Sequence, residues 1–181
     1  MRWIVLAFII AKPFTASAAT AYLRPTTGFM MQPASQYYHA IYGFAADAGT
    51  DSGSFAGRLM YWERPKFRAN GFEDQDSGWF ALIGSKVTKT KNYGLHAWAG
   101  TGRVTGFIKA TSDEGIDESG VTSRDYSMPG FAAAIELQAD WRSVATSIGH
   151  QTLIAYGDKD QRDARVAWPF NFGFLSVGMR F

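Results

Sequence analysis

The chain ends in Leu175-Ser176-Val177-Gly178-Met179-Arg180-Phe181, a stretch in which every second residue is apolar. Successive side chains of a β-strand point to opposite faces. The odd-numbered residues would therefore lie together on a wholly apolar face, and the serine, glycine and arginine on the other. The stretch predicts an amphipathic strand that closes on an aromatic carboxyl-terminal residue.

The opposite end of the chain has the pattern of an export signal. Met1-Arg2 precedes an apolar run from Trp3 to Ala11, and Ala16-Ser17-Ala18 follows. A basic start, an apolar core of about 7–15 residues and a small-x-small cleavage site are typical of a secretory signal peptide that is removed. We therefore predict a signal peptide at 1–18 and one mature domain at 19–181.

The composition narrows the function classes. No later stretch approaches the roughly 18 apolar residues that a membrane-spanning helix needs, while the chain holds 8 Tyr and 6 Trp, residues that favour the membrane–water boundary. The absence of cysteine excludes a disulfide scaffold and a cysteine-based metal site or nucleophile. A net charge of +2 gives no indication of a nucleic-acid partner. A soluble, secreted β-sandwich is the alternative, and the two chain ends weigh against it.

The export signal and the amphipathic strand with its aromatic end together resemble bacterial outer-membrane β-barrels. In that family the barrel-assembly machinery reads the terminal Phe, so the resemblance implies an outer-membrane location and contact of Phe181 with this machinery. The predicted fold class is all-β, an eight-stranded antiparallel transmembrane β-barrel.

The chain divides into eight segments with a period of two. They are 21–31, 37–47, 54–64, 79–88, 92–110, 130–139, 141–156 and 164–181. Short turns are expected at 49–53, at 89–91 and at Asp140, and longer outer loops at 32–36, 64–78, 111–129 and 157–163. Barrels of this class have an even number of strands, short periplasmic turns and longer outer loops, which places both chain ends in the periplasm. The first segment is the weakest, because Pro25 lies within it and proline cannot donate to a strand ladder.

The interior of an eight-stranded barrel has room for packed side chains or one small ligand, and none for a wide channel. Charged side chains are costly against lipid, so we expect Glu136 to point inward and to pair with Arg58 or Arg180. Arg24 completes a predicted plug of paired charges, since an unpaired charge there would be costly.

The register of the last strand places four aromatic residues inside the outer half of the barrel. They are Trp168, Phe170, Phe172 and Phe174. Inward glycines on segment 92–110 (Gly94, Gly100, Gly102 and Gly106) would leave volume unfilled, and an apolar cavity suits an acyl chain. Alternatively, a bulge at 169–171 turns these aromatic residues toward the lipid.

Two histidines are candidates for acyl chemistry. His39 lies close to the outer end of its segment, and the second outer loop contains Asp76-Ser77. An imidazole, a carboxylate and a hydroxyl at one rim could perform acyl transfer; a solvated acidic loop is the simpler interpretation. His150-Gln151-Thr152 resembles the His-x-Ser of outer-membrane lipid A deacylases, with threonine in place of serine.

Four short motifs resemble the outer-membrane lipid A palmitoyltransferases (PagP), eight-stranded barrels that hold a phospholipid acyl chain. The motifs are Tyr38-His39-Ala40, Tyr61-Trp62-Glu63-Arg64-Pro65, Asp76-Ser77 and 120–125. The resemblance implies that His39, Asp76 and Ser77 are catalytic. The spacing from Arg64-Pro65 to Asp76-Ser77 is shorter than in that family, and its amino-terminal amphipathic helix has no counterpart.

Three functions follow as hypotheses. The first is a lipid A acyltransferase that takes an acyl chain from phospholipid. The second is a non-enzymatic barrel that anchors, adheres or stabilises the envelope, and the third is a lipid A deacylase using His150. The expected partners are outer-membrane lipids (phospholipid and lipid A); no cofactor or metal ion is expected.

Overall fold

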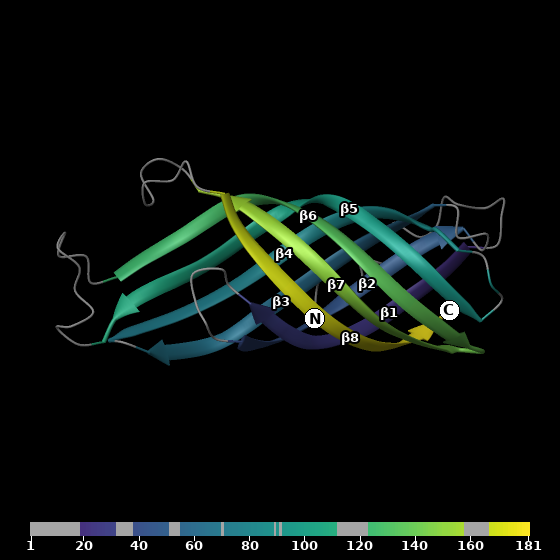
Figure 1. Ribbon diagram of the computed structural model, residues 1–181, viewed down its shortest axis with the longest axis horizontal. Coiled ribbons are helices and arrows are strands. Elements are labelled where there is room, and N and C mark those ends of the chain that lie inside the picture. The colour runs from purple at the N-terminus through teal and green to yellow at the C-terminus, as the bar shows by residue number, and fades with distance from the viewer. Residues whose placement is uncertain are drawn as a thin grey trace.

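The computed structural model describes residues 19–31, 38–50, 55–69, 71–88, 90, 92–111, 123–157 and 167–181. They form one closed antiparallel barrel of eight strands in chain order (Figure 1). The strands are β1 (Ala19–Met31), β2 (Tyr38–Thr50), β3 (Ala56–Ala69), β4 (Phe72–Lys86), β5 (Tyr93–Ala110), β6 (Ser123–Trp141), β7 (Val144–Tyr156) and β8 (Ala167–Arg180). This part of the chain contains no helix long and apolar enough to cross a membrane. The predicted fold class is confirmed. The predicted signal peptide lies outside the described residues.

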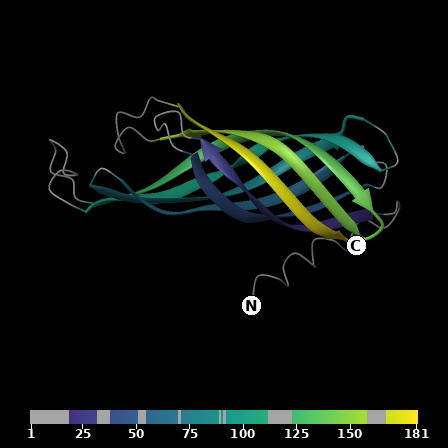
Figure 2. The ribbon, with the colours of Figure 1, turned by 60° about the horizontal axis from the view of Figure 1, so that its bottom comes forward.

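Strand β1 closes the barrel, so the doubtful first segment is a strand. It pairs with β2 from Ala19↔Thr50 to Met31↔Tyr38 and with β8 from Tyr22↔Arg180 to Met31↔Asn171. Figure 2 shows β1 in purple beside β8 in yellow. The β1–β8 pairing skips Arg24 and Pro25 and resumes at Thr26 in the same register. The strand therefore accommodates Pro25 where the ladder is interrupted, because proline has no N–H to donate.

The two ends of the barrel differ. One end, here called the terminal end, carries Ala19, Phe181 and the connections β2–β3, β4–β5 and β6–β7. Backbone hydrogen bonds join Ala21 and Phe181 there, with N···O distances of 3.3 and 2.8 Å. The turn predicted at Asp140 is wrong by two residues: β6 runs to Trp141, and Arg142 makes the turn with a φ of 51°. The opposite end is called the loop end.

At the loop end, two predicted loops are shorter than expected. The segment 64–78 is a hairpin in which β3 extends to Ala69 and β4 begins at Phe72. Asn70-Gly71 is a strong signal for a two-residue hairpin turn, and Gly71 has a φ of 76°, which favours glycine. Similarly, β6 begins at Ser123, within the predicted loop 111–129.

The outer surface of the barrel is a belt of exposed apolar side chains. Leu59, Ile83, Ile135, Ile148 and Leu175 are each at least half exposed. On the loop-end side of Leu59 and Ile83, near the middle of β2, β3 and β4, the rings of Phe44, Tyr61 and Trp79 touch one another, with centroids 4.6–5.7 Å apart. An apolar band flanked by aromatic residues is the surface that a transmembrane barrel presents to lipid.

Candidate functional site

The interior of the barrel contains charged residues toward the terminal end and apolar residues beyond them. Alternation along each strand produces this arrangement, because every second side chain points inward. On β8, Phe170, Phe172, Phe174 and Ser176 are buried, and the residues between them face outward. The predicted register of the last strand is confirmed, and the alternative with a bulge at 169–171 is wrong. The side chain of Trp168 lies outside the described part.

Two arginines and two carboxylates form a closed ring of ion pairs inside the barrel. Arg24 pairs with Asp47 and, at 2.5 Å, with Glu136. Arg58 pairs with the same two acids, at 2.7 Å to Asp47 and 2.6 Å to Glu136. All four side chains are almost fully buried. Each carboxylate thus has two cationic partners, which meets the requirement that buried charges be paired and hydrogen-bonded.

Neutral groups complete this ion cluster. Arg24 also donates to the Gln138 side-chain oxygen at 3.0 Å, and the hydroxyls of Ser147 and Ser176 are 2.6 Å apart beside it. The Arg58 guanidinium lies 3.9 Å from the centre of the Trp98 ring, a cation–π contact that joins the charges to the apolar part. The prediction that Glu136 is inward and pairs with Arg58 is confirmed. Arg180 is exposed and does not belong to the plug.

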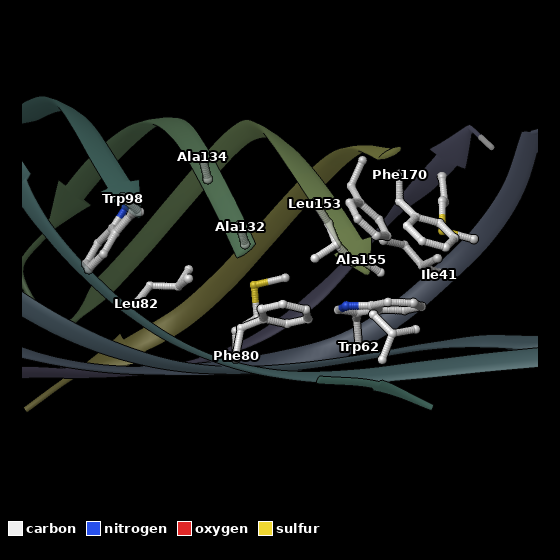
Figure 3. Packing of buried hydrophobic residues seen from close by; sticks show 14 of the residues in the cluster. Ile41, Trp62, Phe80, Leu82, Trp98, Ala132, Ala134, Leu153, Ala155 and Phe170 are labelled. Carbon is white, nitrogen blue, oxygen red and sulfur yellow. The ribbon is translucent and has the colours of Figure 1, made fainter. Parts of the chain in front are cut away.

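The apolar part of the interior is filled by side chains of the chain itself. Trp62 packs on Phe172 with centroids 5.0 Å apart, and Figure 3 shows Trp62, Phe80, Leu153 and Phe170 reaching toward one another from four strands. The inward glycines provide the space for these rings. A Cβ on Gly102 would meet Phe80 at 2.6 Å, and one on Gly106 would meet Tyr126 at 2.4 Å.

The volume that the glycines were expected to leave free is therefore occupied. A cavity lies between the ion cluster and the aromatic residues, and its lining includes Arg24, Trp62, Glu136 and Phe172. It has a volume of about 10 Å³. This is the lower limit for one water molecule. Phe170, Phe172 and Phe174 are inward and apolar as predicted, but they surround no space of acyl-chain size in the described residues. Their assignment to an acyl pocket stays a prediction.

A second polar cluster lies inside the barrel at the loop end. Arg64 is 1% exposed; its Nε donates to Asp76 at 2.9 Å and its Nη1 to Asp74 at 3.0 Å. The β3–β4 register shifts between Arg64 and Phe67, so both residues face inward across Pro65-Lys66. His39 is also buried, and its ring meets the Phe67 ring edge-on at 4.5 Å.

His39 and Asp76 thus lie at the same end of the barrel, which the presence of β1 predicts. Ser77 does not join them, because it follows Asp76 on the strand and faces outward. Its hydroxyl is 3.1 Å from the Thr105 hydroxyl on the outer surface. The structure brings together an imidazole, an arginine and two carboxylates, without the predicted serine. In the described residues, no group of three or more His, Asp or Glu side chains could hold a metal ion.

His150 faces outward from β7. The Thr152 hydroxyl lies 3.4 Å from His150 Nε2 and donates to the Asn171 side-chain oxygen at 3.0 Å. The His-x-Thr pair is therefore a polar cluster on the lipid-facing surface. The long contact to His150 and the use of the hydroxyl proton by Asn171 do not prepare Thr152 as a nucleophile.

Sequence reasoning missed Asp47, Arg64 and Asp74. Asp47 continues the inward series His39, Ile41, Gly43 and Ala45 by one more step, so the alternation itself could have found it. Arg64 and Asp74 lie in the predicted loop 64–78, and the dipeptide Asn70-Gly71 in the sequence is the signal that favours a hairpin there.

No family model matches the chain, and no curated protein matches it. Several solved structures do match the chain. The attachment invasion locus protein Ail of Yersinia pestis has a TM-score of 0.59 and 10% identity, covering 92% of this chain and 100% of that one. Neisserial surface protein A has a TM-score of 0.57 and 11% identity, covering 90% and 95%. A major outer membrane protein from Thermus thermophilus has a TM-score of 0.59 and 10% identity, covering 91% and 100%.

Identities near 10% show the fold alone. These comparisons do not support the resemblance to the palmitoyltransferases. They agree with the lipid-facing belt and support the predicted location in the outer membrane. The chain has the fold of the small, eight-stranded bacterial outer-membrane β-barrels.

Proposed function

We propose that this protein is a non-enzymatic outer-membrane barrel that stabilises the envelope and presents its loop end outside the cell. The observation that carries the proposal is the filled interior: a ring of ion pairs toward one end, packed aromatic side chains beyond it, and a cavity no larger than one water. Such an interior favours a packed barrel over a channel or an acyl-chain site.

The neighbouring structures favour the same function. Ail is described as an attachment invasion locus protein, and it has been crystallised with a heparin analogue, sucrose octasulfate. In our proposal, attachment to anionic polysaccharides is a task that the loop end of the present barrel could share. The strands β3 to β6, which are 14 to 19 residues long, extend that end beyond the aromatic residues Tyr61 and Trp79.

Lipid A acyltransfer remains the second candidate. Its specific support is that His39 and Asp76 are both buried at the loop end, where Asp76 pairs with Arg64 and the His39 ring packs on Phe67. Against it stand the outward Ser77 and the filled interior. Deacylation at His150 has weaker support, since the contact to Thr152 is 3.4 Å.

Mass spectrometry of lipid A from cells with and without the gene separates the three functions. We expect identical lipid A, together with increased sensitivity of the deletion strain to detergent. A gain of one acyl mass that disappears in His39→Ala would establish the acyltransferase, and a loss that disappears in His150→Ala would establish the deacylase. Both variants must reach the outer membrane in normal amounts for the comparison to count.

A further inference from the structure

A small polar cluster lies on the outer surface of β4, β5 and β6. Ser77, Thr105 and Ser127 are cross-strand partners in one row. The hydroxyls of Ser77 and Thr105 are 3.1 Å apart, and Arg103 Nη1 donates to the Ser127 hydroxyl at 3.1 Å. One guanidinium and three hydroxyls therefore converge where a transmembrane barrel otherwise presents apolar side chains.

The position of this cluster relative to the membrane is marked by aromatic residues. Trp79 is the cross-strand partner of Arg103, and it packs on Tyr61 and Phe44. Aromatic groups on the outside of a barrel lie at the level of the lipid headgroups. The row of hydroxyls begins one step beyond Trp79, toward the loop end, which is the level expected for the headgroups of that leaflet.

No residue in the described part of the chain neutralises the charge of Arg103. Arg103 is exposed and makes no ion pair with another residue in the described part of the chain. The acidic residues nearest to it in register on this face are Glu63 and Asp125. Glu63 accepts hydrogen bonds from Tyr61 at 2.7 Å and from Gln75 at 2.6 Å, and Asp125 lies two residues beyond Ser127.

We propose that Arg103, with Ser77, Thr105 and Ser127, binds a phosphate group on the headgroup of a lipid in the leaflet at the loop end. A guanidinium presents several N–H donors in a planar fork that matches phosphate oxygens, and the hydroxyls add neutral donors. The aliphatic and aromatic belt below the site would contact the acyl chains of the same lipid. This assignment gives Ser77 a binding role on the outer face in place of the predicted catalytic one.

The test is native mass spectrometry of the folded, full-length mature protein with diphosphorylated lipid A as the probe. We expect Arg103→Gln to weaken binding by about tenfold, because it removes charge-assisted hydrogen bonds to phosphate. Thr105→Val should weaken it less, and Arg103→Lys should fall between the two. Arg180→Gln removes an exposed arginine at the terminal end and serves as the matched control, with binding unchanged.

Two further arms identify the source of the phosphate. In the first, dephosphorylated lipid A should bind the unmodified protein as weakly as diphosphorylated lipid A binds Arg103→Gln. In the second, excess inorganic phosphate should not displace diphosphorylated lipid A from the unmodified protein. Equal binding of both lipids, or unchanged binding by Arg103→Gln, would overturn the proposal. Displacement by inorganic phosphate would overturn the assignment to a lipid. The change in gel mobility on heating confirms that each variant is folded, and Thr105→Val keeps the proposal testable if Arg103→Gln does not fold.

Discussion

Glu136 and its partners show how charged residues are accommodated inside this barrel. Each of the two buried carboxylates contacts both buried arginines, so no member has an uncompensated charge. The pairs themselves contribute little net stability, since desolvation offsets most of the Coulomb attraction. Their importance appears when one member is removed.

Replacing Glu136 with alanine should therefore lower the free energy of unfolding by about 3–5 kcal/mol, because two buried guanidinium groups lose a shared partner. Urea titration of the protein folded into lipid vesicles measures the change. Gln138→Ala is the control: it removes a buried neutral hydrogen-bond acceptor of Arg24 and should cost only about 1–3 kcal/mol. An unfolding free energy for Glu136→Ala equal to that of the unmodified protein would show that water reaches the cluster.

At the scale of the elements, β8 is the strand whose two faces are clearest from the sequence. Its inward and outward faces follow the sequence alternation from Phe170 to Met179 without interruption. Phe181 follows it, is 72% exposed and is tied to β1 by its backbone. Its side chain is therefore free to be bound during assembly.

We predict that Phe181→Asp reduces the amount of folded protein in the outer membrane severalfold, because the assembly machinery would no longer bind the strand end. Phe55→Asp tests the specificity, since Phe55 is a 56% exposed aromatic residue near the same end of the barrel. The two proteins are compared by immunoblot of outer-membrane fractions. Equal amounts of both would mean that Phe181 is an ordinary lipid-facing aromatic residue.

The eight strands could be predicted from sequence because a strand with two chemically different faces has a period of two. In β2, for example, successive residues from Tyr38 to Ala45 alternate between the two faces of the strand, and the sequence alone shows this alternation. The ends of a strand are harder to predict where both of its faces are polar. Beyond Glu63 and before Trp79, ion pairs such as Arg68–Glu73 (2.6 Å) hold the β3–β4 hairpin together, and a polar hairpin has the composition of a loop.

The candidate site was predictable only in part. His39 and Asp76 could be placed at one end from strand counting alone. The face of Ser77 also follows from alternation once Asp76 is known to be on a strand. The sequence predicts a loop at 64–78, however, and a loop has no regular faces to assign. The filling of the interior depends on how rings such as Trp62 and Phe80 pack over glycines on neighbouring strands, and this requires the register of the whole barrel.

At the scale of the whole molecule, the side chains of the described residues fill and seal the closed barrel. The ion cluster and the packed aromatic residues lie in series along the axis, so an ion would have to displace both. The arrangement favours a barrel that anchors and presents surface groups over one that transports a solute or holds an acyl chain.

Conductance across planar lipid bilayers tests this claim most directly. The folded protein should leave the bilayer at its baseline conductance, and Glu136→Ala should do so as well, because the aromatic residues seal the interior independently of the ion cluster. Insertion is verified on the same preparation by resistance of the strands to protease. Discrete, reproducible conductance steps from the unmodified protein would contradict the account.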